Sequence, residues 1–215
     1  MISLLYQIPT WIQRLYADVV WRGDLHKKCV YLTFDDGPVP EVTPQVLDIL
    51  EHYGVRATFF CVGENVYRYG DLAREVVRRG HSIGNHTFNH LSGCKHKRDE
   101  YLNNIALCED VLSRTLGSDW TSEHLFRPPY GRMRWQQRRW LKSHYRIVLW
   151  DIITHDYNAN YSPQQILAIV RRYVRCGSVI VFHDSIKAQR NVLSALPLAI
   201  EYLQSEGYQF EVIRP

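Results

Sequence analysis

The alternation of short β-rich runs with helix-forming segments is the feature that most constrains the fold of this 215-residue chain. From Cys29 onward, runs of β-branched and aromatic residues are separated by stretches whose apolar residues recur at helical spacing. This order predicts βα units joined into a mainly parallel sheet. The expected strands are residues 29–34, 57–62, 81–85, 125–127, 146–151, 178–183 and 208–213.

Helix-start residues such as Ser, Thr and Asp, and glycines at helix ends, mark the segments between these strands. The expected helices lie within residues 43–54, 71–80, 99–116, 162–177 and 194–204, the last with Pro197 in its first turn. A chain of this length can form one domain with a substantial core. We therefore expect a single domain over residues 29–215.

Residues 1–28 precede the first expected strand and are predicted to form a helical packing arm. Their apolar residues follow a helix-like spacing that Pro9 interrupts. These residues are Leu4, Leu5, Ile8, Trp11, Ile12, Leu15 and Tyr16. We expect the arm to cover one end of the folded domain. The alternative is a membrane-surface role, which its few Lys and Arg residues do not favour.

The net charge of +4 and the pI near 8.8 are only mildly basic. Basic residues are scattered among acids, except around Arg132–Arg134 and Arg138–Arg139, which we expect on a solvated helix face. Nucleic-acid binding normally needs a stripe of positive charge on one face, so no nucleic-acid partner is expected.

The five cysteines are odd in number and have no paired spacing, which favours buried thiols in a reducing compartment over a disulfide framework. No apolar run reaches the length of about 18 residues that a membrane span needs. Residues 1–8 lack a basic region and an evident cleavage site. No transmembrane segment and no signal peptide are therefore expected, and a cytoplasmic location is favoured.

Three short motifs carry the candidate chemistry. The first expected strand ends in two adjacent acids, Asp35 and Asp36, before Gly37 and Pro38. Two carboxylates in one mouth push their pKa values apart, so that one can act as a base, although the same residues also suit a solvated turn.

The second motif places His86 and His90 four residues apart, the spacing that brings side chains together on a helical turn. Completed by a carboxylate, two imidazoles form a three-ligand metal site with an open position for water. In the third motif Arg127 precedes two prolines, which stiffen the backbone around a charge. Each of these motifs alone is a weak indication.

In this order, TFDDGP, HTFNH and FRPPYG resemble the motifs of polysaccharide deacetylases of the NodB-homology type, carbohydrate esterase family 4. The resemblance covers about residues 29 to 214 and implies an α/β fold, a distorted (β/α) barrel of about seven parallel strands. It also implies Asp35 as catalytic base and Asp36, His86 and His90 as ligands of one divalent ion. Zn²⁺ suits this ligand set best, and Co²⁺, Ni²⁺ or Fe²⁺ also suits it.

The resemblance also assigns roles to residues that do not bind the ion. Arg127 is expected to orient Asp35, and the backbone N–H of Tyr130 to stabilise an oxyanion. His183, in Val181-Phe182-His183, is expected to act as general acid. Substrate contacts are expected from Pro129, Tyr130, Asp156 and Tyr157.

One motif departs from the family pattern Asp-x-x-Asp-Trp, because this chain has Ile153-Thr-His-Asp156-Tyr157. The first acid of that pattern normally supports the catalytic histidine. We therefore expect either that Asp151 or another nearby acid contacts His183, with Asp184 least favoured, or that His183 has no acidic partner.

The sequence thus predicts metal-dependent removal of acetyl groups from a carbohydrate, either a polymer of N-acetyl hexosamines or an O-acetylated glycan. One alternative is hydrolysis of a non-sugar amide or cyclic imide in a closed pocket. Another is a metal- or carbohydrate-binding protein without catalysis. A pure binding protein has no need of Asp35, Arg127 and His183 together, which favours an enzyme.

Overall fold

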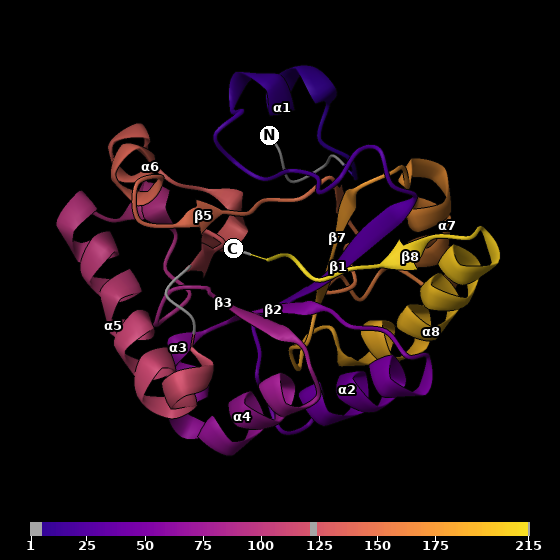
Figure 1. Cartoon of the computed structure of the whole chain (residues 1–215), viewed down its shortest axis with the longest axis horizontal. Helices are drawn as coiled ribbons and strands as arrows, with labels where there is room; N and C mark the ends of the chain where they lie inside the picture. Colours follow the sequence, from indigo (N-terminus) through magenta and orange to yellow (C-terminus); the bar gives the residue numbers. More distant parts are fainter. Residues whose placement is uncertain (1–5, 121–123, 215) are drawn as a thin grey trace.

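A computed structural model describes residues 6–120 and 124–214 and shows a curled parallel sheet surrounded by helices (Figure 1). The strand order is β5-β4-β3-β2-β1-β7-β6, and β8 pairs with β1. All these strand pairs are parallel. The strands are β1 (Cys29–Asp35), β2 (Thr58–Cys61), β3 (Ser82–Asn85), β4 (Leu125–Phe126), β5 (Arg146–Ile147), β6 (Ile152–Ile153), β7 (Ser178–His183) and β8 (Gln209–Phe210). The prediction of a distorted (β/α) barrel is confirmed.

Helices cover the outside of this sheet, as the βα alternation predicts. They are α1 (Thr10–Leu15), α2 (Thr43–His52), α3 (Gly63–Arg68), α4 (Gly70–Arg78), α5 (Arg98–Leu116), α6 (Trp135–Leu141), α7 (Pro163–Tyr173) and α8 (Gln189–Ser205). The start of α7 shows the local cause: the Ser162 hydroxyl accepts from the backbone N–H of Gln165, and the Gln165 side chain accepts from the backbone N–H of Ser162.

Strand β1 is buried along its whole length and has a different character on each face. Val30, Leu32 and Phe34 pack toward the outer helices, where the Phe34 ring stacks on that of Phe59 with centroids 4.9 Å apart. Thr33 and Asp35 alternate with them and therefore point to the inside of the barrel. The apolar outer face of β1 packs against the helices, so the polar residues on its other face point into the barrel.

Strand β7 lies beside β1 in register, with Asp35 opposite His183 at their carboxyl ends. Both residues belong to the inward-pointing sets of their strands. Hydrogen bonding between the two strands therefore fixes the relative position of two predicted catalytic residues.

The N-terminal arm lies along the side of the barrel between β5 and β6, the two ends of the main strand path. Val20 forms a parallel bridge with Val148, and Gln7 an antiparallel bridge with Ile152. The arm therefore covers the open side of the sheet and not one end of the barrel. It is also less helical than expected, with α1 as its one α-helix within residues 6–28.

Several expected elements differ in the structure, and the strand expected at residues 208–213 is only Gln209–Phe210. The segment 146–151 forms only the start of a strand, because the chain crosses from β5 at one edge of the sheet to β6 at the other. Helix α8 begins at Gln189, five residues before the expected start, so Pro197 lies in its interior and not in its first turn.

Candidate active site

The turn after β1 separates the two adjacent acids. Asp36 adopts a positive φ of 81°, a conformation that non-glycine residues rarely take and that often marks functional sites. Its backbone carbonyl accepts a hydrogen bond of 2.8 Å from the Asn65 side chain, and the next N–H, from Gly37, donates to Asp184 over 3.1 Å. This turn gives Asp35 and Asp36 different neighbours.

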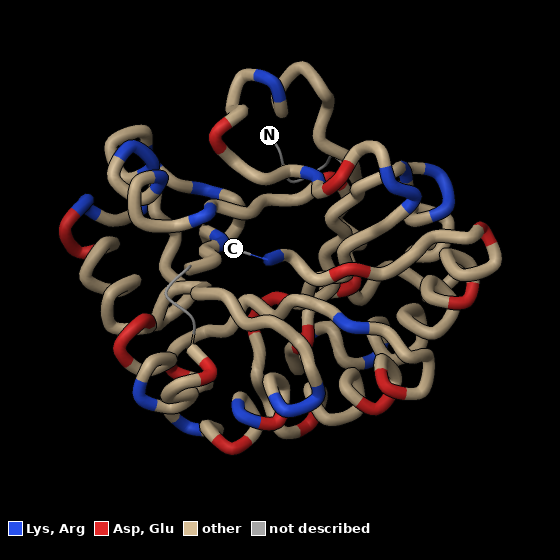
Figure 2. The backbone as a smooth tube through the Cα atoms, viewed as in Figure 1, with Lys and Arg blue, Asp and Glu red and all other residues tan. Residues whose placement is uncertain are grey.

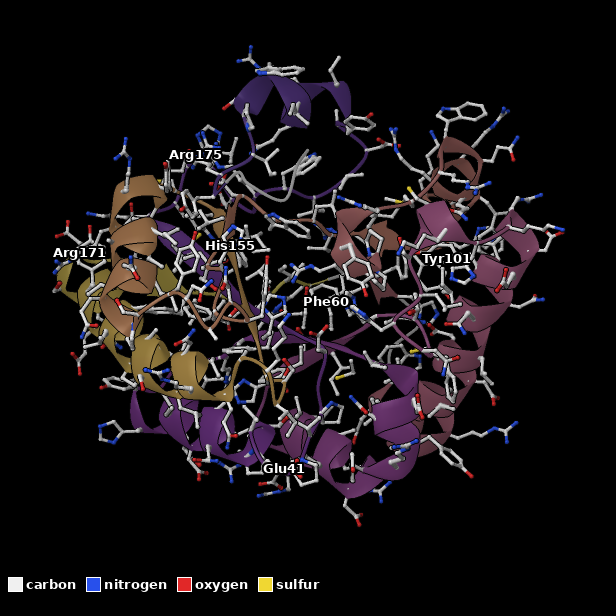
Figure 3. The ribbon with its side chains drawn as sticks, turned by 180° about the vertical axis from the view of Figure 1, so that it is seen from behind. Glu41, Phe60, Tyr101, His155, Arg171 and Arg175 are labelled. Atoms are coloured by element: carbon white, nitrogen blue, oxygen red, sulfur yellow. The ribbon has the colours of Figure 1, made fainter. Side chains whose placement is uncertain are left out.

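Asp35 is paired with Arg127 inside the barrel. The Arg127 Nη1 lies 2.6 Å from Asp35 Oδ1, and both residues are buried. Arg127 also donates to the Thr33 hydroxyl and the Leu149 carbonyl, and its guanidinium lies 4.0 Å from the centroid of the Phe60 ring. Phe60 lies near the middle of the molecule in Figure 3. These contacts hold the Asp35 carboxylate in one orientation.

His86 and His90 come together through a loop and not through the helical turn that their spacing suggested. Thr87 and His90 have positive φ values of 65° and 55°. Buried Asn85 supports the loop, accepting from the Thr87 N–H over 2.9 Å and donating to the Ile105 carbonyl over 3.0 Å. Asn85 escaped the sequence reasoning, because an amide at a strand end is common in turns.

Side-chain atoms of Asp36, His86 and His90 lie within 4.8 Å of one another, the only such metal-compatible group in the part of the chain that the structure describes. His86 Nδ1 is 2.7 Å from the Arg127 carbonyl, which can only accept, so Nδ1 carries the proton and Nε2 is free to bind. Burial lowers the pKa of His86 to about 4. Burial works against ionisation of Asp36, but the hydrogen bond from His90 and the neighbouring imidazoles lower its pKa overall. Neutral imidazole and an ionised carboxylate are the forms that a divalent metal requires.

His183 has an acidic partner, and that partner is Asp156. One Asp156 oxygen lies 2.7 Å from His183 Nδ1 and the other 2.7 Å from the His183 backbone nitrogen. Asp156, expected to contact substrate, is completely buried, and its carboxylate is used by His183. The arrangement instead leaves His183 Nε2 as the ring nitrogen that is free for chemistry.

Asp151, the acid expected first as partner of His183, is used elsewhere. Its carboxylate lies 2.5 Å from Arg175 Nη2 and 2.8 Å from the Ser178 hydroxyl, and it also accepts from Gln13 in the arm. Ser178 and His183 stand at opposite ends of β7, about 16 Å apart at the usual rise per residue. Asp151 therefore anchors the arm and cannot reach the histidine.

Seven of the ten predicted site residues line one cleft of about 420 Å³ at the carboxyl ends of the strands, whereas Arg127, Pro129 and Asp156 do not belong to its lining. Its lining consists of Asp35, Asp36, His86, His90, Tyr130, Arg132, Trp150, Ile153, His155, Tyr157, His183 and Lys187. Pro129, expected to contact substrate, is buried and is not part of this lining. Sequence reasoning missed Arg132, Trp150 and Lys187, since single residues in loops carry no pattern.

Tyr157, which replaces the family tryptophan, forms one wall of the cleft beside His183. Its ring meets the His183 ring edge-on with centroids 4.9 Å apart, and its hydroxyl lies 3.0 Å from His155 Nδ1. His155, labelled in Figure 3, has a positive φ of 58°, and burial lowers its pKa. The Tyr157 hydroxyl thus forms a hydrogen bond with His155. Tryptophan, which has no hydroxyl, does not form the same bond.

Comparison with known proteins agrees with this geometry. Residues 22–145 match the family model described as polysaccharide deacetylase. A peptidoglycan-N-acetylglucosamine deacetylase of Bacillus cereus is 35% identical over 203 residues, which cover 94% of this chain and 72% of that protein. The peptidoglycan-N-acetylmuramic acid deacetylase PdaC of Bacillus subtilis is 30% identical over 190 residues, 88% of this chain and 39% of its own length.

A solved structure gives the same result at the level of the fold. The crystal structure of the Bc1960 peptidoglycan N-acetylglucosamine deacetylase superposes with a TM-score of 0.86 at 33% identity, covering 96% of this chain and 95% of that one. By sequence and by fold, this chain belongs to the polysaccharide deacetylase family of carbohydrate esterase family 4, hydrolases that remove acetyl groups from carbohydrates.

Proposed function

We propose that the protein hydrolyses the acetamido group of N-acetyl hexosamine units in a peptidoglycan-type glycan. The two relatives named above act on N-acetylglucosamine and N-acetylmuramic acid units of peptidoglycan, according to their names. The observation that carries the proposal is that the Asp36–His86–His90 group lies in one cleft with Asp35 and His183. Arg127 holds Asp35, and Asp156 holds His183. The amine that departs from an amide is a poor leaving group, so hydrolysis needs both a base for the attacking water and a general acid for the amine.

One divalent ion, Zn²⁺ in our proposal, is held by Asp36, His86 and His90. Bound there, it supplies a Lewis acid for the acetyl carbonyl and lowers the pKa of water. The remaining work falls to side chains of this chain. Asp35, fixed by Arg127 at 2.6 Å, takes the proton of the attacking water.

The backbone N–H of Tyr130 donates to the developing oxyanion, a role that its position at the cleft and its positive φ of 60° support. His183 then gives its Nε2 proton to the departing amine, while Asp156 holds Nδ1 and stabilises the imidazolium. The exposed Tyr130 ring and Tyr157 flank the sugar, and Ile153 gives the cleft an apolar wall in place of the family acid.

The direct test is acetate release from N-acetylglucosamine oligomers, from peptidoglycan and from acetylated xylan, each with and without a chelator. We expect release from the N-acetylated substrates, loss of activity in chelator, and recovery with Zn²⁺ or Co²⁺. Release from the acetyl ester alone, or activity that survives complete metal removal, contradicts the proposal.

A further inference from the structure

The segment just after α1 contacts α6, although 119 residues separate the ends of the two helices in the sequence. Asp18, just after α1, is paired with Arg138 and lies 3.8 Å from Lys142, both from the region of α6. The Arg138 guanidinium also lies 4.6 Å from the centroid of the Tyr16 ring. Figure 1 shows α1 at the top and α6 at the upper left, neighbouring each other on the outside of the barrel.

Large apolar side chains project from these two helices into solvent. Trp11 is 65% exposed, Leu15 68% and Trp135 65%. Arg14 lies between Trp11 and Leu15 on α1, and Arg139 lies on α6, where its guanidinium is 5.5 Å from the centroid of the Trp135 ring. We call these five residues, Trp11, Arg14, Leu15, Trp135 and Arg139, the basic-aromatic face.

The segment that contains α6 is rich in basic residues, although Arg127 is buried in the barrel and Arg138 is paired with Asp18. Residues 124–150 contain seven Lys and Arg residues and no Asp or Glu, whereas the whole chain has a net charge of only +4. The rest of the chain is therefore net acidic. Figure 2 shows blue without red along α6, while both colours alternate on the helices at the bottom of the view. Within residues 6–120 and 124–214, Arg14 and Arg139 have no acidic partner.

We propose that the basic-aromatic face binds the surface of an anionic lipid bilayer. Tryptophan is enriched at membrane–water interfaces, and exposed leucine gains by entering the acyl boundary. Arginines without acidic partners gain by approaching anionic headgroups. No helix within the described residues is long and apolar enough to cross a bilayer, so this contact is with the membrane surface.

Two other occupants fit the face less well. A soluble polyanion accounts for the arginines but not for three projecting apolar side chains, which gain little from a hydrated polymer. A second copy of the chain brings two faces of the same charge together, which opposes association. A bilayer with anionic lipids satisfies both the apolar and the basic residues.

The fold places positive charge beside the arm, which has little of its own. Residues 1–28 have few Lys and Arg residues, which is why the sequence did not favour a membrane role for them. Folding places α6 and its arginines beside α1, so the charge comes from a segment distant in sequence. Because α6 begins three residues after Arg132, which lines the cleft, a bilayer bound to this face lies beside the catalytic cleft.

Sedimentation with lipid vesicles tests the proposal on the full chain. We expect binding to phosphatidylcholine vesicles that contain about a third of phosphatidylglycerol, weak binding to pure phosphatidylcholine, and weakening by salt. The variant Trp11→Ser/Leu15→Ser/Trp135→Ser should bind at least about tenfold more weakly. Its matched control is Tyr67→Ser/Leu107→Ser, which removes residues that are 74% and 45% exposed on α3 and α5.

A second pair of variants separates local charge from net charge. Arg14→Gln/Arg139→Gln should weaken vesicle binding about 25-fold, whereas Arg68→Gln/Arg114→Gln, which removes the same charge from ion-paired arginines on α3 and α5, should leave it nearly unchanged. Acetate release from a soluble oligosaccharide serves as the folding control, because none of these residues lines the cleft.

Three results overturn the proposal. The natural protein fails to bind anionic vesicles while it remains active on soluble substrate. Alternatively, binding depends on the arginines but not on the apolar residues, which indicates a site for polyanions. Finally, light scattering shows a dimer that the triple Ser variant abolishes, without vesicle binding, which assigns the face to a second copy.

Discussion

Asp156 binds His183 at two points, with Oδ1 2.7 Å from the ring Nδ1 and Oδ2 2.7 Å from the backbone nitrogen. Burial alone lowers the pKa of His183, but the charge and hydrogen bond of Asp156 outweigh it and raise that pKa to about 9. The imidazole is therefore protonated below about pH 9 and can serve as an acid at neutral pH. Asp156, the second acid of the family pattern, therefore supports His183 in a chain that has Ile153 at the position of the first acid.

Replacing Asp156 with Asn should shift the alkaline limb of kcat for amide substrates to lower pH. A general acid is active while protonated, so the natural protein should lose activity as the pH rises through about 9. Without the carboxylate, burial dominates and the pKa of His183 falls, so that activity declines at lower pH. The pH profile of acetate release from an N-acetylglucosamine oligomer measures this shift.

The same variant should affect an acetyl ester less than an amide, because an alcohol departs more easily than an amine. Asp184→Asn is an informative companion, since Asp184 contacts Gly37 and Thr43 and not the imidazole. If Asp156→Asn loses activity at the same alkaline pH as the natural protein, Asp156 does not control the proton of His183.

Asp35→Asn and Asp36→Asn should separate catalysis from metal binding. Asp35→Asn keeps the three-ligand group and should lower kcat about 10²- to 10⁴-fold with nearly unchanged metal content, because it removes the base alone. Asp36→Asn removes the only carboxylate of that group and should lose both metal and activity. Metal content after dialysis, measured beside turnover, distinguishes the two, and equal metal loss in both contradicts this division of roles.

The barrel and most residues of the cleft could be predicted from the sequence alone. The nearly continuous apolar run Val30–Phe34 is typical of a strand buried on both faces, and parallel strands bring their carboxyl ends to one edge. Motifs that are far apart in the sequence therefore meet at the cleft, although the sequence itself contains no distances. Strand boundaries near residue 150 were wrong, because the choice between one strand and two depends on which edge of the sheet the chain must reach.

The partner of His183 could not be identified from spacing alone. Asp151 and Asp156 both lie near the fifth expected strand, and only the course of the chain after Ile153 decides which one faces the imidazole. His155, which directly precedes Asp156, adopts a positive φ, so the backbone turns there in a way that strand periodicity does not describe. The contact of α1 with α6 was beyond the sequence for a similar reason, since it depends on tertiary packing of distant segments.

Asp151→Asn should destabilise the fold without moving the alkaline limb of the activity. It removes the charge partner of Arg175 and weakens acceptance from Ser178 and Gln13. Loss of one member of a buried pair costs about 3 to 5 kcal/mol, and we expect about 3 kcal/mol because Arg175 is 30% exposed.

Denaturant unfolding measures this change in the free energy of unfolding. Asp110→Asn, which removes the partner of an exposed Arg114, is the matched control and should cost less than about 1 kcal/mol. A shifted pH profile in Asp151→Asn would instead connect Asp151 to the proton of His183.

The last prediction concerns Ile153→Asp, which restores the family acid at its usual place in the sequence. His183 Nδ1 is already occupied by Asp156, so a second carboxylate has no ring nitrogen to support. Ile153 lines the cleft together with Asp35 and Asp36, and a new carboxylate there adds like charge beside them. We therefore expect no rise in the ratio of amide to ester activity, and lower activity on both substrates. Ile153→Asn provides the neutral control of the same shape, so that a loss confined to Ile153→Asp reports charge. A rise in the amide-to-ester ratio for Ile153→Asp alone would show that Asp156 by itself does not fully support His183.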